Sequence, residues 1–335
     1  MATRNMVTVG LSSHRPEMVS LLADRMFKHD AIFLEEPPAA GFKKMLAGDL
    51  KIDEYLLPLD YEFPEFSARM CALLKALKTE GKIIFQVEPF LEILAEVHDF
   101  FAAGHGPGDI RKNSIQYPVY LAEKNATGAL LAYYRLAAAG GFSETIQAIK
   151  RFAKADAARF RLRDSLRSQA LAPLVARYGS AFIEAGEMHY PLWHLLSEKL
   201  SASSRVRPVY MYEKVLGKSG GVGRIYGPGD LLTLLYIYHQ DIDHPDRENV
   251  LAARSLIHAK LVAKEEMTEG LELLPHLRNE LYCNQQVRRL TIDDCARLFA
   301  LIRLDFETRC GLRRWRRWLQ GMVPPSLRQV KCTIR

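Results

Sequence analysis

The chain has 335 residues, 48% of them hydrophobic and 25% charged, which are the proportions of a soluble globular protein with one large domain or two ordinary ones. Its net charge of +7 comes entirely from the segment after residue 302, where nine Arg and Lys face two Asp and Glu. The first 302 residues are therefore neutral overall, which argues against a nucleic-acid-binding core. The five cysteines form no Cys-x-x-Cys pair, and no apolar stretch suits a signal peptide or a membrane span. We therefore expect a cytoplasmic protein with reduced thiols.

The N-terminal segment predicts one strand–helix–strand unit of a parallel sheet. Residues 6–10 are rich in β-formers and lead to His14, and a helix with one apolar face follows. Residues 31–34 then predict a buried parallel strand that ends at Glu35 and Glu36. Because the carboxyl ends of parallel strands share one edge of a sheet, we expect His14 and Glu35 to meet there.

Two later strands also end in ionisable residues. Residues 82–87 predict a third strand that stops at Glu88, and a later apolar strand runs into Gly186, Glu187 and, two residues further, His189. A carboxylate and an imidazole at a strand end can bind a metal or move a proton. Helix capping explains any one of these residues but not their repeated occurrence at one edge, so the cluster predicts a functional site.

This order of motifs resembles a known family. A strand ending in His, a helix, a strand ending in Glu, a strand ending in an acid, an Arg-Asp helix and a strand followed by Gly-x-x-His resemble the TraB/Tiki/GumN group. That group is similar in turn to the erythromycin esterase and ChaN-like proteins. In chain order the matching residues are His14, Glu35, Glu88, Arg163-Asp164 and His189. The resemblance covers residues 6–200.

The resemblance implies hydrolysis of a peptide or ester bond in a peptide or small molecule. In a metal-dependent version, His14, Glu35 and His189 would hold a divalent ion such as Mn, Co or Zn, with Glu36 as a weaker ligand. Two imidazoles and one carboxylate leave a coordination position open for water.

The remaining residues of the cluster would act on the reaction. Glu88 or Glu187 would be the general base, and Arg163 would stabilise the developing oxyanion. Without a metal, His14 would be the base and Glu35 would orient it, as the resemblance to erythromycin esterases implies.

The alternative is a non-catalytic ligand-binding or regulatory protein on the same scaffold. Two departures from the family pattern favour it. The first motif, Gly10-x-x-x-His14, is one residue longer than the family's, and no Arg follows Glu88.

The chain divides into three parts by composition. Residues 1–200 predict an α/β domain with a largely parallel sheet flanked by helices and a helical insertion at about 119–178. Residues 201–229 predict a glycine-rich linker, and residues 230–335 predict a helical domain. Gly217-Lys218-Ser219 is not a phosphate-binding loop, because Tyr212 stands where the motif needs a glycine, so no nucleotide cofactor is expected.

Two further clusters lie in the C-terminal third. The loop residues His239, Asp241, Asp243 and His244 form a separate, weaker metal candidate, which a solvated and capped turn also explains. The segment Arg313-Arg-Trp-Arg-Arg-Trp318 places both tryptophans on one face of a helix. That face would either bind an acidic partner, RNA or a membrane surface, or cover the protein's own core. The oligomeric state stays open.

Overall fold

The structure, a computed structural model, confirms the predicted α/β fold. The residues that it describes are 5–59, 62–200, 204–218, 225–239, 244–267 and 273–307. They form two compact units. The first unit comprises Met1–Ala126, Ala155–Ile225 and Ala263–Arg278, and the second comprises Thr127–Lys154, Tyr226–Val262 and Asn279–Arg335.

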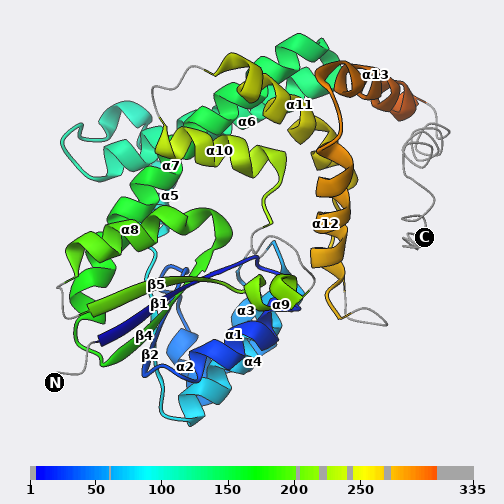
Figure 1. Ribbon diagram of the computed structural model, residues 1–335. Coiled ribbons are helices and arrows are strands. Elements are labelled where there is room, and N and C mark those ends of the chain that lie inside the picture. The colour runs from blue at the N-terminus through cyan, green and yellow to red at the C-terminus, as the bar shows by residue number, and fades with distance from the viewer. Residues whose placement is uncertain are drawn as a thin grey trace. The chain divides into compact units, whose positions relative to one another are not determined.

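The elements are labelled in Figure 1. The strands are β1 (Asn5–Ser12), β2 (Ala31–Leu34), β3 (Ile83–Gln86), β4 (Ser180–Gly186) and β5 (Ser204–Tyr210). The helices are α1 (Met18–Met26), α2 (Phe42–Ala47), α3 (Ile52–Leu56), α4 (Pro64–Thr79), α5 (Pro89–Ala102), α6 (Gln116–Ala139), α7 (Phe142–Val175), α8 (Tyr190–Lys199), α9 (Glu213–Lys218), α10 (Pro228–Tyr238), α11 (Pro245–Leu261), α12 (Pro275–Val287) and α13 (Ile292–Glu307). Short 3-10 turns span Pro107–Asp109 and Glu187–His189. A proline in the first turn starts several of these helices, because its missing N–H has no partner there in any case.

The first unit is built on one sheet of five parallel strands in the order β3-β2-β4-β1-β5. The fourth strand along the chain is therefore the central one, with β1 on one side and β2 on the other. All four of β3, β2, β4 and β1 end at the same edge, which collects the residues that follow them in the sequence.

Side chains alternate between the two faces of the sheet. Ile32 and Phe182 pack with residues of α1, α2, α4 and α9 on one face. Val9 and Ile183 pack on the other face with α8 and the C-terminal half of α7. The sheet is thus buried on both sides, which explains why its inner strands are almost wholly apolar.

The segment predicted as a linker holds the fifth strand. β5 pairs with β1 in parallel, with Val9 opposite Pro208. Pro208 is compatible with this position because β5 lies at the edge of the sheet, where a strand needs ladder hydrogen bonds on one side only. The α/β unit therefore extends beyond residue 200, and residues 263–278 return to it from the C-terminal third. Residues 219–224 of the glycine-rich segment lie outside the described residues.

The second unit is helical, as predicted for the C-terminal region. α10 packs against α11, and α11 packs against α13. A buried polar cluster joins three of its segments: Lys150 Nζ lies 3.0 Å from Glu248 Oε2, and the Tyr236 hydroxyl donates to the same oxygen at 2.8 Å.

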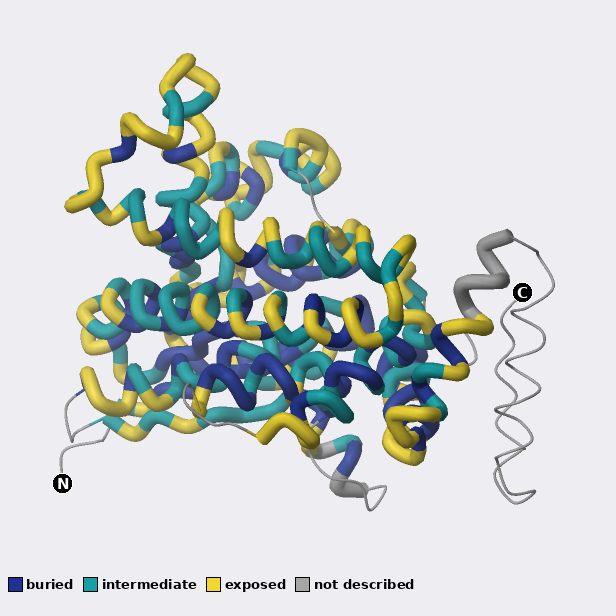
Figure 2. The backbone as a smooth tube through the Cα atoms, turned by 90° about the horizontal axis from the view of Figure 1, so that it is seen from above, coloured by how far each residue is buried: buried dark blue, intermediate teal, exposed yellow. Residues whose placement is uncertain are grey.

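Burial follows the expected pattern of helices with one face on a core. The helices in Figure 2 change repeatedly along their length between buried and exposed residues. Within the described part of the chain, no helix combines the length and the apolar character that a bilayer crossing requires.

Candidate functional site

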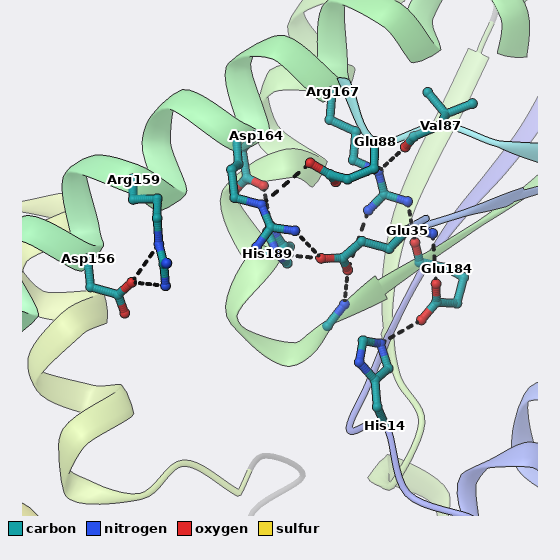
Figure 3. Close-up of polar contacts among 12 residues, drawn as sticks. His14, Glu35, Val87, Glu88, Asp156, Arg159, Asp164, Arg167, Glu184 and His189 are labelled. Atoms are coloured by element: carbon teal, nitrogen blue, oxygen red, sulfur yellow. Dashed lines mark hydrogen bonds and ion pairs between the residues drawn. The ribbon is translucent and has the colours of Figure 1, made fainter. Parts of the chain in front are cut away.

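Glu184 connects the two residues that the sequence predicted to meet. His14 follows β1 and Glu35 follows β2, but β4 lies between these strands and brings Glu184 between the two side chains. Glu184 Oε1 lies 3.1 Å from His14 Nε2, and Glu184 Oε2 accepts a hydrogen bond from the Glu35 backbone N–H at 2.9 Å (Figure 3). The sequence analysis missed Glu184.

His14, Glu35 and Glu184 form a group that could hold a metal ion. One ligand atom from each lies within 4.8 Å of the others. The ring of His14 stacks on Phe66 with centroids 5.2 Å apart, which limits its orientation. The His14 side chain is 36% exposed whereas that of Glu184 is 4% exposed, so the group is reached from the histidine side.

His14 lies in a strongly acidic environment. Burial opposes its protonation, but the hydrogen bond and charge of Glu184, together with the charges of Glu35 and Glu36, raise its pKa to about 9. The partner of His14 is therefore Glu184, where the sequence analysis expected Glu35.

Glu35 makes several hydrogen bonds and ion pairs through both oxygens of its carboxylate. Its Oε1 lies 2.7 Å from His189 Nε2 and 3.0 Å from an Arg163 nitrogen, and its Oε2 accepts from the Gly186 N–H at 2.6 Å. Burial opposes ionisation of Glu35, but the charge and hydrogen bond of His189, with the charges of Arg167 and Arg163, hold its pKa well below its usual range. Glu35 is thus an anion whose orientation is fixed.

His189 lies between two carboxylates. Its Nδ1 is 2.5 Å from Asp164 Oδ1, and its Nε2 faces Glu35. Burial opposes its protonation, but the charges and hydrogen bonds of Glu35 and Asp164 raise its pKa to about 9. Both ring nitrogens of His189 thus face a carboxylate oxygen. In this arrangement Glu184 stands in the ligand group where the sequence analysis placed His189.

Helix α7 presents two arginines, one turn apart, to the strand ends. Arg163 contacts Glu35 and also lies 3.5 Å, through Nε, from Glu88 Oε1. Glu88 is completely buried and faces both guanidinium groups, with Arg167 Nε 3.7 Å from its Oε2. Glu88 thus offsets the positive charge of the two arginines at the strand ends.

Arg167 links the backbone of two strand ends. It is fully buried and donates to the carbonyl oxygens of Val87 at 3.0 Å and of Glu184 at 2.7 Å (Figure 3). The sequence analysis did not single out Arg167, although its spacing of four residues from Arg163 places both on one helix face.

Glu36 and Glu187 are the two remaining predicted acids, and each has a different environment. Glu36 Oε2 accepts from Gln86 Nε2 at 3.0 Å, and burial raises the pKa of Glu36, opposed by this hydrogen bond. Glu187 is half-buried in the 3-10 turn after β4 and lies on the side of Tyr212. Burial raises the pKa of Tyr212, and the negative charge of Glu187 contributes in the same direction.

A second buried network borders the site. The Tyr212 hydroxyl lies 3.0 Å from Ser13 Oγ and 3.5 Å from Glu17 Oε1. The other oxygen of Glu17 lies 2.5 Å from His276 Nδ1. His276 Nε2 accepts from the Met267 N–H at 2.8 Å, so the ring carries its proton on Nδ1 and donates it to Glu17. This network ties Met267 and His276 to the residues that follow β1.

The other candidates belong to the second unit or lie outside the described residues. His239 and His244 are exposed, next to the end of α10 and the start of α11, and they belong to the second unit. Asp241 and Asp243 lie outside the described residues, as does the segment from Arg313 to Trp318.

The chain is similar to an uncharacterized protein of Archaeoglobus fulgidus. The two are 30% identical over 289 residues, which cover 86% of this chain and 96% of the archaeal protein. No protein-family model matches the chain, and no solved structure matches it. Identity at this level over almost the full length of the relative means that the chain belongs to the same family as this archaeal protein.

Proposed function

We propose that the chain is a hydrolase of peptide or ester bonds that uses a divalent metal held by His14, Glu35 and Glu184. The observation that supports this most is the convergence of their three ligand atoms within 4.8 Å at the carboxyl edge of a parallel sheet. One imidazole and two carboxylates suit Mn, Co or Zn by ligand type and balance the charge of a divalent ion.

The family resemblance is part of the same proposal. The residues that match the TraB/Tiki/GumN motifs come from distant parts of the chain, yet contacts link them into one cluster around Glu35 and Glu184. These residues are His14, Glu35, Glu88, Arg163, Asp164 and His189. If these residues served only as helix caps, there would be no reason for them to converge in one cluster.

A bound divalent ion would supply an activated water and would polarise the bond to be broken. The chain's own residues then have separate tasks. The imidazolium of His189, braced by Asp164, fixes the orientation of the Glu35 carboxylate, as neighbours of metal ligands commonly do. Arg163 is 16% exposed and anchored by Glu35, so it is the fixed cation of the site that can stabilise negative charge on a substrate oxygen.

The test is to measure metal content and hydrolysis together. The protein is purified without metal, loaded with Mn, Co or Zn, and analysed by plasma mass spectrometry and with a panel of peptides and esters. We expect about one metal per chain. Glu184→Gln, which keeps the shape but removes a charged ligand, should lower metal affinity by about tenfold or more. Glu80→Gln, the same change at an exposed residue at the end of α4, is the matched control.

Two results would contradict the metal-dependent proposal. One is a wild-type protein that retains none of the three metals. The other is a folded Glu184→Gln variant with unchanged metal affinity. In the first case hydrolysis of an ester by the metal-free protein would favour the esterase version with His14 beside Glu184. Saturable ligand binding without turnover would favour the non-catalytic alternative.

A further inference from the structure

Arg15, which directly follows His14, carries a buried nitrogen without a partner. Its guanidinium lies over the ring of Phe63, 4.2 Å from the centroid. Its Nη1 is buried and makes no hydrogen bond to any residue that the structure describes. A charged N–H group that has left water is expected to find an acceptor, so an unpaired one points to an acceptor that comes from outside the chain.

The nearby carboxylate of Glu17 is already engaged. Glu17 Oε1 accepts from the Leu277 N–H at 3.0 Å, and Glu17 Oε2 pairs with His276. Tyr212 also lies within 3.5 Å of Glu17. Neither oxygen of Glu17 bonds to Arg15, so the charge of Arg15 stays available.

Two hydroxyl groups lie in the same region. Ser13 precedes His14, and its Oγ lies 3.0 Å from the Tyr212 hydroxyl. The charge of Arg15 acts on that phenol: burial raises the pKa of Tyr212 and Arg15 opposes the rise. Ser13, His14 and Arg15 thus offer a hydroxyl, a candidate metal ligand and a cation in three consecutive residues.

The start of α4 supplies the rings that hold this segment. Phe63 lies under Arg15, and Phe66, one turn further, stacks on His14. A guanidinium that lies over the face of an aromatic ring can still offer its N–H groups to an acceptor, as in oxyanion recognition.

We infer that Arg15, together with the hydroxyl groups of Ser13 and Tyr212, binds an oxyanion group of the ligand beside His14. The group is a carboxylate or a phosphate, since both offer oxygens that match the guanidinium edge. One consequence rests on the proposed hydrolase activity: the substrate of that reaction carries such an anionic group close to the bond that is broken.

The experiment uses the full chain without metal and with all chelator removed, so that neither metal binding nor turnover enters the result. Inorganic phosphate and acetate are titrated separately by calorimetry and by thermal shift, against chloride at equal ionic strength. We expect saturable binding of one of the two anions. The anion that binds more tightly assigns the ligand group as a phosphate or a carboxylate.

Three variants decide the role of Arg15. Arg15→Gln removes the charge but keeps a polar side chain, and it should weaken anion affinity by about tenfold or more. Arg15→Lys should retain part of the affinity, because it keeps the charge but not the forked geometry. Arg177→Gln, the same change at an exposed residue after α7, should bind as the wild type does. Circular dichroism confirms that each variant is folded.

The inference is overturned if neither anion binds more tightly than chloride, or if folded Arg15→Gln binds as well as the wild type. The assay contains no metal and no substrate. Its result therefore tests anion binding by Arg15 even if the metal-dependent hydrolase proposal fails.

Discussion

Gly10 is the position in β1 where a side chain would collide with the core. A Cβ built on Gly10 would lie 2.2 Å from Phe182 Cζ and 2.9 Å from each Cε of the same ring. Phe182 belongs to β4, is completely buried and lies two residues before Glu184. Gly10 pairs with Glu184 in the register of β1 and β4, so the collision would occur directly beside the proposed metal group.

The stability cost of Gly10→Ala follows from these distances. Nonbonded carbon atoms are most stable about 3.5–4.0 Å apart, so the ring must retreat by more than about 1 Å in a close-packed core. Overpacking of this kind destabilises by about 1–3 kcal/mol. The lower backbone entropy of the unfolded Ala variant offsets part of that, by about 0.5–1 kcal/mol. We therefore expect a net loss of about 1–2 kcal/mol in the free energy of unfolding.

Urea unfolding followed by circular dichroism measures this loss. Gly128→Ala is the matched control, because Gly128 lies within α6 and a Cβ there meets nothing within 4 Å. It should stabilise by about 0.5–1 kcal/mol. Adding Phe182→Leu should relieve the collision, so that the double variant is more stable than the sum of the two single effects by about 1 kcal/mol. Wild-type stability of Gly10→Ala, or strict additivity in the double variant, would refute the reasoning.

Two further predictions concern buried ionisable groups. Burial lowers the pKa of His29 to about 4, whereas the unfolded chain takes up this proton near pH 6.5, so stability should fall by at most about 3 kcal/mol as the pH drops from 6.5 to 4. Urea titrations at several pH values should show that His29→Leu lacks this part of the pH dependence, and an unchanged dependence would contradict the assignment. In the second unit, Lys150→Met leaves the buried Glu248 carboxylate without its cation and should destabilise by about 3–5 kcal/mol. Thermal unfolding should show a smaller loss for Lys150→Met/Glu248→Leu, and an equal or larger loss would argue against this charge pair.

Local patterns in the sequence predicted the elements well but not their order in space. Residues 31–34 were predicted as a strand and form β2 with the same bounds, because four consecutive apolar residues between polar ones suit a doubly buried strand. That β4 lies between β1 and β2 depends on contacts about 150 residues apart, and no local pattern records them. β5 was missed because Arg205, Arg207 and Pro208 interrupt its apolar residues, which an edge strand tolerates.

The candidate site was predicted only in part, because local patterns reveal residues after strands but not contacts between distant segments. His14, Glu35 and His189 stand out because each follows the end of a strand within a few residues, whereas Glu184 lies inside one. A carboxylate in an otherwise apolar strand is rarely buried without a partner, and this signal could have identified Glu184. The pairing of His276 with Glu17 joins residues 259 positions apart, and only the tertiary structure brings them together.

The central position of β4 has a consequence for the newly made chain. Ribosomes add about 5–20 residues per second, so β4 follows β2 out of the ribosome by roughly 7–30 s. During this interval the apolar strands β1 and β2 lack their common neighbour, and contacts of this sequence separation form slowly even afterwards. Since β4 also carries Glu184, the His14, Glu35 and Glu184 group can assemble only together with the centre of the sheet, after more than half of the chain has been made.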